Sequence, residues 1–93
     1  MPGVVRLGDV NSAGGKALLG DRTLIVDGRP VVTVGTPVSP HVPCPKVPMH
    51  CRALTAVGNR NFILNGKPVN VIGNPDTCGH PRVTGSRTFV VGR

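Results

Sequence analysis

Short apolar runs rich in valine alternate with turn residues along the whole chain, and this pattern predicts many short β-strands. Residues 23–37 contain two such runs, separated by Asp27 and Gly28. An Asp-Gly pair in this position is a strong hairpin signal, because a type I′ turn needs positive φ at both of its central residues. Thirteen Gly and ten Pro punctuate the runs, so we expect an all-β fold of short hairpins joined by irregular loops.

The hairpin pattern is repeated within the chain. Residues 61–75 match residues 23–37 at six of fifteen positions, and Asn-Gly replaces Asp-Gly at the turn. The ends of the chain supply a third copy, because residues 87–93 resemble the first strand of the unit and residues 4–9 the second. We therefore expect residues 4–9 to pair antiparallel with residues 87–91. Three similar hairpins predict a pseudo-threefold body that its own termini close.

Every histidine and cysteine lies in one of two patches, and each patch follows the same point of a repeat, after Pro37 or Pro75. Equivalent loops of a symmetric body lie at one end, so we expect these side chains to converge. Zinc takes four tetrahedral nitrogen or sulfur ligands, and such a cluster predicts a metal site. The first patch holds His41, Cys44, His50 and Cys51, and the second holds Cys78 and His80.

The composition indicates a small domain that needs a metal ion or a disulfide for stability. The chain has two Phe and neither Trp nor Tyr, so its core is poor in bulky side chains. Small domains of this kind often need a metal or a disulfide to be stable. The net charge of +7 permits binding to an acidic surface or to nucleic acid. The basic residues are scattered without aromatic side chains for base stacking, which favours a solvated basic surface.

The first residues, from Met1 to Arg6, contain no apolar core of signal-peptide length. No segment approaches the length of a membrane span. We therefore expect synthesis in the cytoplasm and, if the protein leaves the cell, export by a route that uses no cleaved signal. Three cysteines are an odd number, which argues against a framework of disulfides alone.

Three segments resemble the PAAR-repeat family, whose members form the spike tip of type VI secretion systems and contractile phage tails. They are residues 4–9 (VVRLGD), 30–36 (PVVTVGT) and 68–74 (PVNVIGN). Only the first keeps Arg-x-Gly-Asp, and Gly3 stands where the family has proline. The resemblance covers essentially the whole chain. It implies a single domain over residues 1–93, a small β cone on a threefold base with no fused effector extension.

The resemblance also implies one structural zinc near the apex, which the family holds with three His and one Cys. We assign His41, His50, Cys78 and His80 to this site. Cys44 is the alternative to Cys78 as the thiolate ligand. Cys51 is a poor partner for His50, because adjacent side chains of an extended chain point to opposite sides. Cys44 and Cys51 are then left over, and a disulfide between them is able to form after export but not readily in a reducing cytoplasm.

The function implied by the resemblance is structural. Such a protein caps and sharpens a trimeric spike of the valine-glycine-repeat type, one chain per spike trimer, and helps it to pierce a target envelope. Further implied partners are effector proteins and, transiently, the target membrane, but not nucleic acid. The resemblance implies synthesis in a bacterial cytoplasm without a signal peptide, followed by export at the tip of the apparatus or assembly into a phage tail.

An enzymatic role is disfavoured by the residues themselves. The chain contains only four carboxylates, and of these only Asp76 lies near the histidines in sequence. It would at best orient a metal ligand. We expect no substrate cleft in so short a chain, so we predict a protein without catalytic activity. The alternative is a small zinc-stabilised binding module for an acidic partner or nucleic acid.

Overall fold

The computed structural model describes residues 2–41, 44, 46 and 51–91, and these residues form two β-hairpins and a series of isolated β-bridges. Strand β1 (Asp21–Val26) pairs antiparallel with β2 (Arg29–Val31), and β3 (Asn59–Leu64) pairs antiparallel with β4 (Lys67–Val69). The described part of the chain contains no helix, which confirms the all-β prediction. It likewise contains no helix long and apolar enough to cross a membrane.

Both hairpins turn as their dipeptides predict. Asp27 and Gly28 have φ angles of 54° and 79°, and Asn65 and Gly66 have φ angles of 52° and 81°. These positive values at both central positions define the type I′ turn. The first strand of each hairpin also bulges, between Asp21 and Ile25 in β1 and at the same place in β3.

The two ends of the chain form the third hairpin. Gly3 makes an antiparallel bridge with Val90, and the Ser86 amide donates to the Val4 carbonyl at 2.8 Å. The predicted pairing of 4–9 with 87–91 is therefore found only at its start, and it includes residue 3. The chain after Val4 pairs elsewhere because it runs inward: Arg6 makes its bridge with β2.

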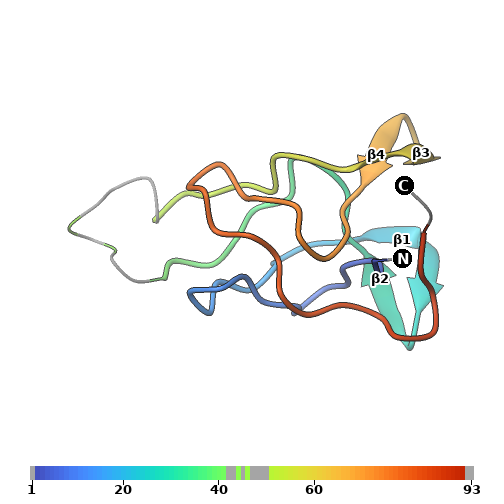
Figure 1. Ribbon diagram of the computed structural model, residues 1–93, viewed down its shortest axis with the longest axis horizontal. Helices are drawn as coiled ribbons and strands as arrows, with labels where there is room; N and C mark the ends of the chain where they lie inside the picture. The colour runs from blue at the N-terminus through green and yellow to red at the C-terminus, as the bar shows by residue number, and fades with distance from the viewer. Residues whose placement is uncertain (1, 42–43, 45, 47–50, 92–93) are drawn as a thin grey trace.

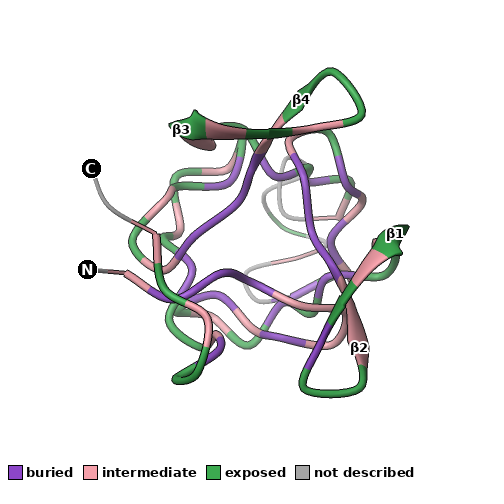
Figure 2. Ribbon diagram, turned by 90° about the vertical axis from the view of Figure 1, so that its right-hand side faces the viewer, coloured by how far each residue is buried: buried purple, intermediate pink, exposed green. Residues whose placement is uncertain are grey.

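A closed ring of backbone hydrogen bonds joins the three units. The Val5 amide donates to the Asn70 carbonyl at 2.9 Å, Asn70 donates to Val32 at 2.8 Å, and Val32 donates back to Val5 at 2.8 Å. All three residues are fully buried, at 0% exposure. Figure 2 shows the buried segments around the centre and the hairpins outside them. Each repeat contributes one residue to this ring, so the ring has the pseudo-threefold arrangement that the sequence predicts.

Equivalent valines of the three units form the core beside the ring. Val4, Val31 and Val69 are fully buried in one apolar cluster, and Phe62 packs against it. The Phe62 ring stacks on that of Phe89, with centroids 5.7 Å apart, so the second hairpin contacts the C-terminal segment. The body measures 36 × 24 × 24 Å, with β1–β4 and both termini at one end (Figure 1). The cone shape stays a prediction.

Candidate metal centre

A second ring of bridges lies beyond the first and positions the loops that carry the candidate ligands. Each bridge in it joins one repeat to the next, as in the first ring. The chain continues from this ring away from the hairpins, so the loops of different repeats lie side by side at the opposite end (Figure 1). The bridges are Ala17–Val38, Thr55–Asp76 and Asn11–Arg82.

The loops bring together three of the four predicted ligands. His41, Cys78 and His80 each offer one ligand atom, and these atoms all lie within 4.8 Å of one another. The Cys78 sulfur is 3.4 Å from Nε2 of His41. His41 is buried, and Cys78 and His80 are half-buried. Residues 37 positions apart in sequence thus converge, as the repeat predicts.

The two imidazoles are held by contacts outside the cluster. Nδ1 of His41 donates to the Ser39 carbonyl at 2.8 Å, which leaves Nε2 as the atom that faces Cys78. Nδ1 of His80 lies 3.2 Å from the Ser12 hydroxyl. A Cβ atom on Gly15 would lie 2.5 Å from Nδ1 of His41, so only glycine allows this close approach. Such contacts are those that orient histidines which bind metal ions.

The donor set fits zinc in kind and in spacing. Two imidazole nitrogens and one thiolate are typical ligands of a structural zinc ion. With metal–ligand bonds of about 2.0–2.3 Å, two ligands of a tetrahedral ion lie about 3.3–3.8 Å apart. The distance of 3.4 Å between Cys78 Sγ and His41 Nε2 falls in this range. The group could therefore hold a metal ion after small side-chain adjustments.

The fourth predicted ligand, His50, lies outside the described residues. Two cysteines near it are described and form a disulfide, Cys44–Cys51, with Cα atoms 5.3 Å apart. The Cys44 amide donates to the His41 carbonyl at 2.8 Å, so the disulfide adjoins the cluster. Cys78 is the free cysteine, and the disulfide removes Cys44 as the alternative thiolate.

A buried polar layer lies in the second ring, and most of it was not predicted from the sequence. Arg82 and Asp76 form an ion pair at 3.0 Å, with both side chains fully buried. The same Asp76 oxygen accepts from Asn11 at 2.8 Å, and Arg82 also donates to the Asp9 carbonyl. The carboxylate of Asp76 thus contacts an amide and a guanidinium. The signal for this layer was positional, because Asp76 and Asn11 are equivalent in the repeat.

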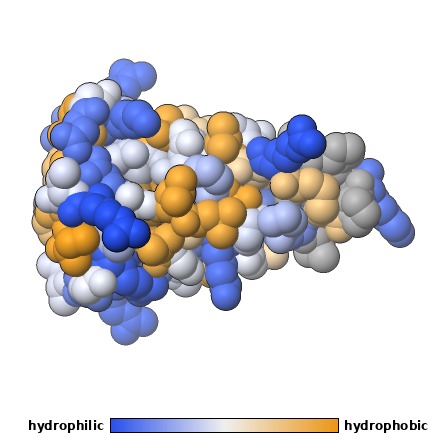
Figure 3. Space-filling view, turned by 180° about the vertical axis from the view of Figure 1, so that it is seen from behind, coloured by the Kyte–Doolittle hydropathy of each residue, from blue (hydrophilic) through white to orange (hydrophobic). Residues whose placement is uncertain are grey.

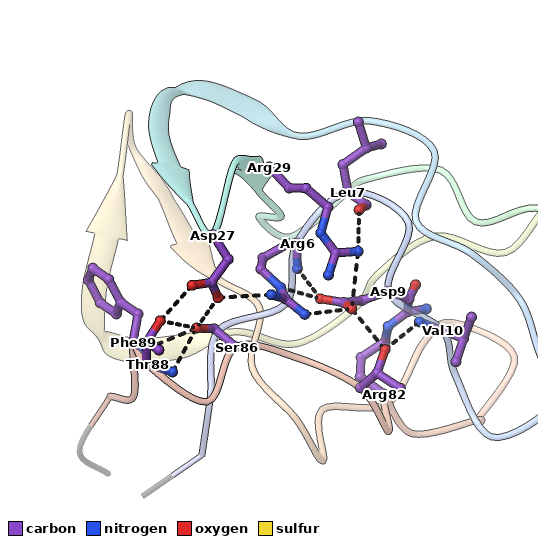
Figure 4. Close-up of polar contacts among 11 residues, drawn as sticks. Arg6, Leu7, Asp9, Val10, Asp27, Arg29, Arg82, Ser86, Thr88 and Phe89 are labelled. Carbon is purple, nitrogen blue, oxygen red and sulfur yellow. Dashed lines mark hydrogen bonds and ion pairs between the residues drawn. The ribbon is translucent and has the colours of Figure 1, made fainter.

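The single Arg-x-Gly-Asp segment forms a second polar network near the hairpins (Figure 4). Arg6 pairs with Asp9 at 3.0 Å and with Asp27 at 2.8 Å. Asp27 also accepts from the hydroxyls of Ser86 and Thr88, at 2.6 and 2.7 Å. The network joins the first hairpin to both terminal segments.

Electrostatics keep the acids of this network ionised. Burial alone would raise the pKa of Asp9, but hydrogen bonds from Arg6 and Thr84 outweigh it, and the pKa is lowered. Hydrogen bonds from Ser86 and Thr88, followed by the charge of Arg6, lower the pKa of Asp27. The Asp9 carboxylate in turn raises the pKa of Arg6. The network is therefore an ionic contact at neutral pH.

The fold and the site define a class of protein: small β proteins with three similar units and a His/Cys cluster at one end. The family model described as PAAR motif matches residues 7–84, and the chain belongs to this family. The PAAR motif is associated with spike-tip proteins of type VI secretion and related systems. The comparison with curated proteins gives no match.

Proposed function

We propose that this protein binds the blunt end of a trimeric spike of the valine-glycine-repeat type and sharpens it into a tip. The closed ring of Val5, Val32 and Asn70 carries this proposal. One chain that meets three identical chains must solve a symmetry mismatch. A body with three similar hairpins around one axis presents three similar surfaces, and so matches a threefold partner.

The hairpin end is the surface that supports this docking. Ile25, Ile63 and Val90 occupy the same position in the three hairpins and are 51%, 52% and 43% exposed. Val26 and Val31 of the first hairpin are buried in the core, so they do not contribute to this surface. Apolar contacts from the three exposed residues and pairing with exposed strand backbone would both contribute to affinity.

At the other end, we propose one structural zinc held by His41, His50, Cys78 and His80. The spacing of the three described donors supports it. The ion would stiffen the loops at the tip, where puncturing concentrates force. A site closed by four protein ligands leaves no position for substrate, so the proposed protein is a structural part and not an enzyme.

The proposal includes the route and the contacts of the protein. It is made in the bacterial cytoplasm without a signal peptide and leaves the cell at the tip of a secretion apparatus, or is built into a phage tail. It touches the target membrane transiently and carries effector proteins. It binds no nucleic acid.

Native mass spectrometry of the protein co-expressed with the spike protein of its genome tests the proposal. We expect a complex of one tip chain and three spike chains. A one-to-one ratio, or no complex with any such spike, contradicts it. The net charge of +7 then favours a zinc-stabilised module for an acidic partner or nucleic acid, and DNA filter binding over a salt series tests that alternative.

A further inference from the structure

The bulge in the first strand of each hairpin contains a five-residue segment that occurs three times. Residues 21–25 read DRTLI, residues 59–63 read NRNFI, and residues 86–90 read SRTFV. All three start at equivalent positions, opposite Val31, Val69 and Val4 in the pairing of the three hairpins. The copies differ at most positions, so a comparison of the three shows which side chains the structure accepts at each position.

The first position is explained by a contact with the backbone amide of the third residue. The Asp21 side chain accepts from the amide two residues later at 2.9 Å. Asn59 does the same at 2.8 Å, and Ser86 at 3.1 Å. These are Asx and ST turns, which short polar side chains form readily. Asp, Asn and Ser are therefore interchangeable there, because each supplies the same acceptor.

The last two positions are explained by packing and pairing. Leu24, Phe62 and Phe89 occupy the fourth position and pack against the valine core. The fifth position makes the bridge to the second strand in each unit. Its side chain is apolar in all three copies and exposed. Each of these roles tolerates several residues, and the sequence varies accordingly.

The second position is arginine in every copy, and nothing within the described structure requires it. Arg22, Arg60 and Arg87 are exposed, and none of their side chains makes a hydrogen bond or ion pair with another described residue. By contrast, Arg6 and Arg82 are held by buried carboxylates. Because these three arginines are identical in diverged copies and their side chains have no partner within the described structure, we look for a partner outside the chain.

We propose that Arg22, Arg60 and Arg87 form a threefold set of cations that docks onto three equivalent carboxylates, one from each chain of a trimeric partner. This rests on the proposed function and names the chemistry of the spike surface. Each bulge carries its arginine three residues before Ile25, Ile63 or Val90, so each hairpin offers both a cation and an exposed apolar side chain. Figure 3 shows hydrophilic and hydrophobic side chains intermixed at the hairpin end.

Arginine rather than lysine suits this role. The planar guanidinium binds a carboxylate through two parallel hydrogen bonds, which fixes direction as well as charge. Three such contacts at 120° would also set the rotation of the tip on the spike axis. Phosphates of a nucleic acid do not follow a threefold arrangement, and aromatic side chains that stack bases are absent from the exposed described residues.

The test compares charge reversals at the two ends of the molecule in the full-length protein. Arg22→Glu, Arg60→Glu and Arg87→Glu are made singly and together. The matched control reverses three exposed basic residues outside the bulges, Lys16, Lys46 and Arg52, with the same change in net charge. Binding to the purified trimeric spike protein is measured over a range of salt concentrations, and circular dichroism verifies the fold of each variant.

We expect each single bulge variant to weaken binding about fivefold, and by similar factors, because each arginine meets an equivalent site. The triple variant weakens it about a hundredfold at low salt, with a flatter salt dependence. The control triple variant changes affinity less than threefold. Equal losses in the two triple variants would show a general charge effect and overturn the proposal.

The outcomes separate this proposal from the proposed function. If the wild-type protein forms the one-to-three complex but the bulge variants bind as the control does, the arginines have no role and the spike-tip function stands. If the wild-type protein does not bind the spike, both fail. Stronger binding of the wild-type protein to DNA or to anionic vesicles than to the spike also overturns the proposal.

Discussion

The Sγ atom of Cys78 lies 3.4 Å from Nε2 of His41, although 37 residues separate them in the chain. The two loops meet because residue 38 and residue 76 hold equivalent places in the second ring of bridges. In a zinc finger the ligands are close in sequence, whereas here the symmetry of the repeats brings distant ligands together. A thiol and an imidazole at this distance have the spacing of two ligands of a tetrahedral zinc ion.

Cys78→Ser should lower the zinc content of the purified protein well below one ion per chain. The thiolate is the soft ligand of the cluster, and structural zinc can contribute roughly 10 kcal/mol of apparent binding energy linked to folding. The melting temperature should fall with it, as it should when a chelator is added to the wild-type protein. Metal analysis and thermal denaturation measure both effects.

Cys44→Ser is the control for that substitution, because the Cys44 sulfur lies in the disulfide. Its zinc content should equal that of the wild-type protein. Loss of zinc from Cys44→Ser but not from Cys78→Ser would reverse the assignment of the thiolate. Less than one zinc per chain in the wild-type protein would contradict the zinc proposal itself.

The Cys44–Cys51 disulfide gives a prediction about redox state. Denatured protein that was purified under oxidising conditions should contain one reactive thiol per chain, and reduced protein three. Closing a loop of this length, with a sequence separation of 7, stabilises a protein by about 2 kcal/mol. The reduced protein should therefore melt at a lower temperature but keep its zinc. Three thiols in the oxidised protein would disprove the disulfide.

The hairpins and their symmetry followed from the sequence because their signals are local and repeated. Asp27-Gly28 and Asn65-Gly66 fix the turn type, and buried valines recur at one place in each unit. The terminal copy was also recognisable, although its pairing includes Pro2 and Gly3 and leaves the C-terminal segment after Val4. The register was harder to predict because the ring that redirects the chain is formed between repeats.

The sequence predicted that the histidines and cysteines would cluster, but it did not predict the buried polar side chains next to the cluster. The repeat placed His41 and Cys78 at one end, and the structure brings them together with His80. The buried pair of Arg82 and Asp76 was not foreseen, because an arginine in a loop usually reads as exposed. Burial of that pair arises from contacts with Asn11 in another repeat, and sequence patterns within one repeat do not report such contacts.

Asp9→Asn should remove the negative charge that pairs with Arg6 at 3.0 Å and with Arg29 at 3.7 Å. In the second repeat Asn74 occupies this place and accepts from a backbone amide, so an amide side chain fits there. The loss should be about 1–3 kcal/mol at pH 7. Urea denaturation of both proteins over a range of pH measures it.

The pH dependence of that difference has a defined sign. The folded protein lowers the pKa of Asp9, so the ionised carboxylate stabilises the fold. Its contribution is complete well above the usual pKa of 3.8 and is lost as the pH falls through that value toward the folded-state pKa. The gap between wild type and variant should therefore narrow below pH 4. A constant gap down to pH 2 would contradict the ionic role.

Closure of the ring by the N-terminal segment gives the last prediction. Deletion of residues 1–8 removes Val4 and Val5, both fully buried, and leaves Val32 and Asn70 without their partners in the ring. The deletion should cost more than the whole stability of a small domain, about 5 kcal/mol, and yield an unfolded chain.

Val5→Ala, a milder change, should cost about 2 kcal/mol, because it opens a cavity at the axis. Val83→Ala removes the same atoms at an exposed site and should change the unfolding free energy by less than about 0.5 kcal/mol. A truncated protein as stable as the full chain, or equal effects of the two alanine substitutions, would show that the ring does not hold the three repeats together.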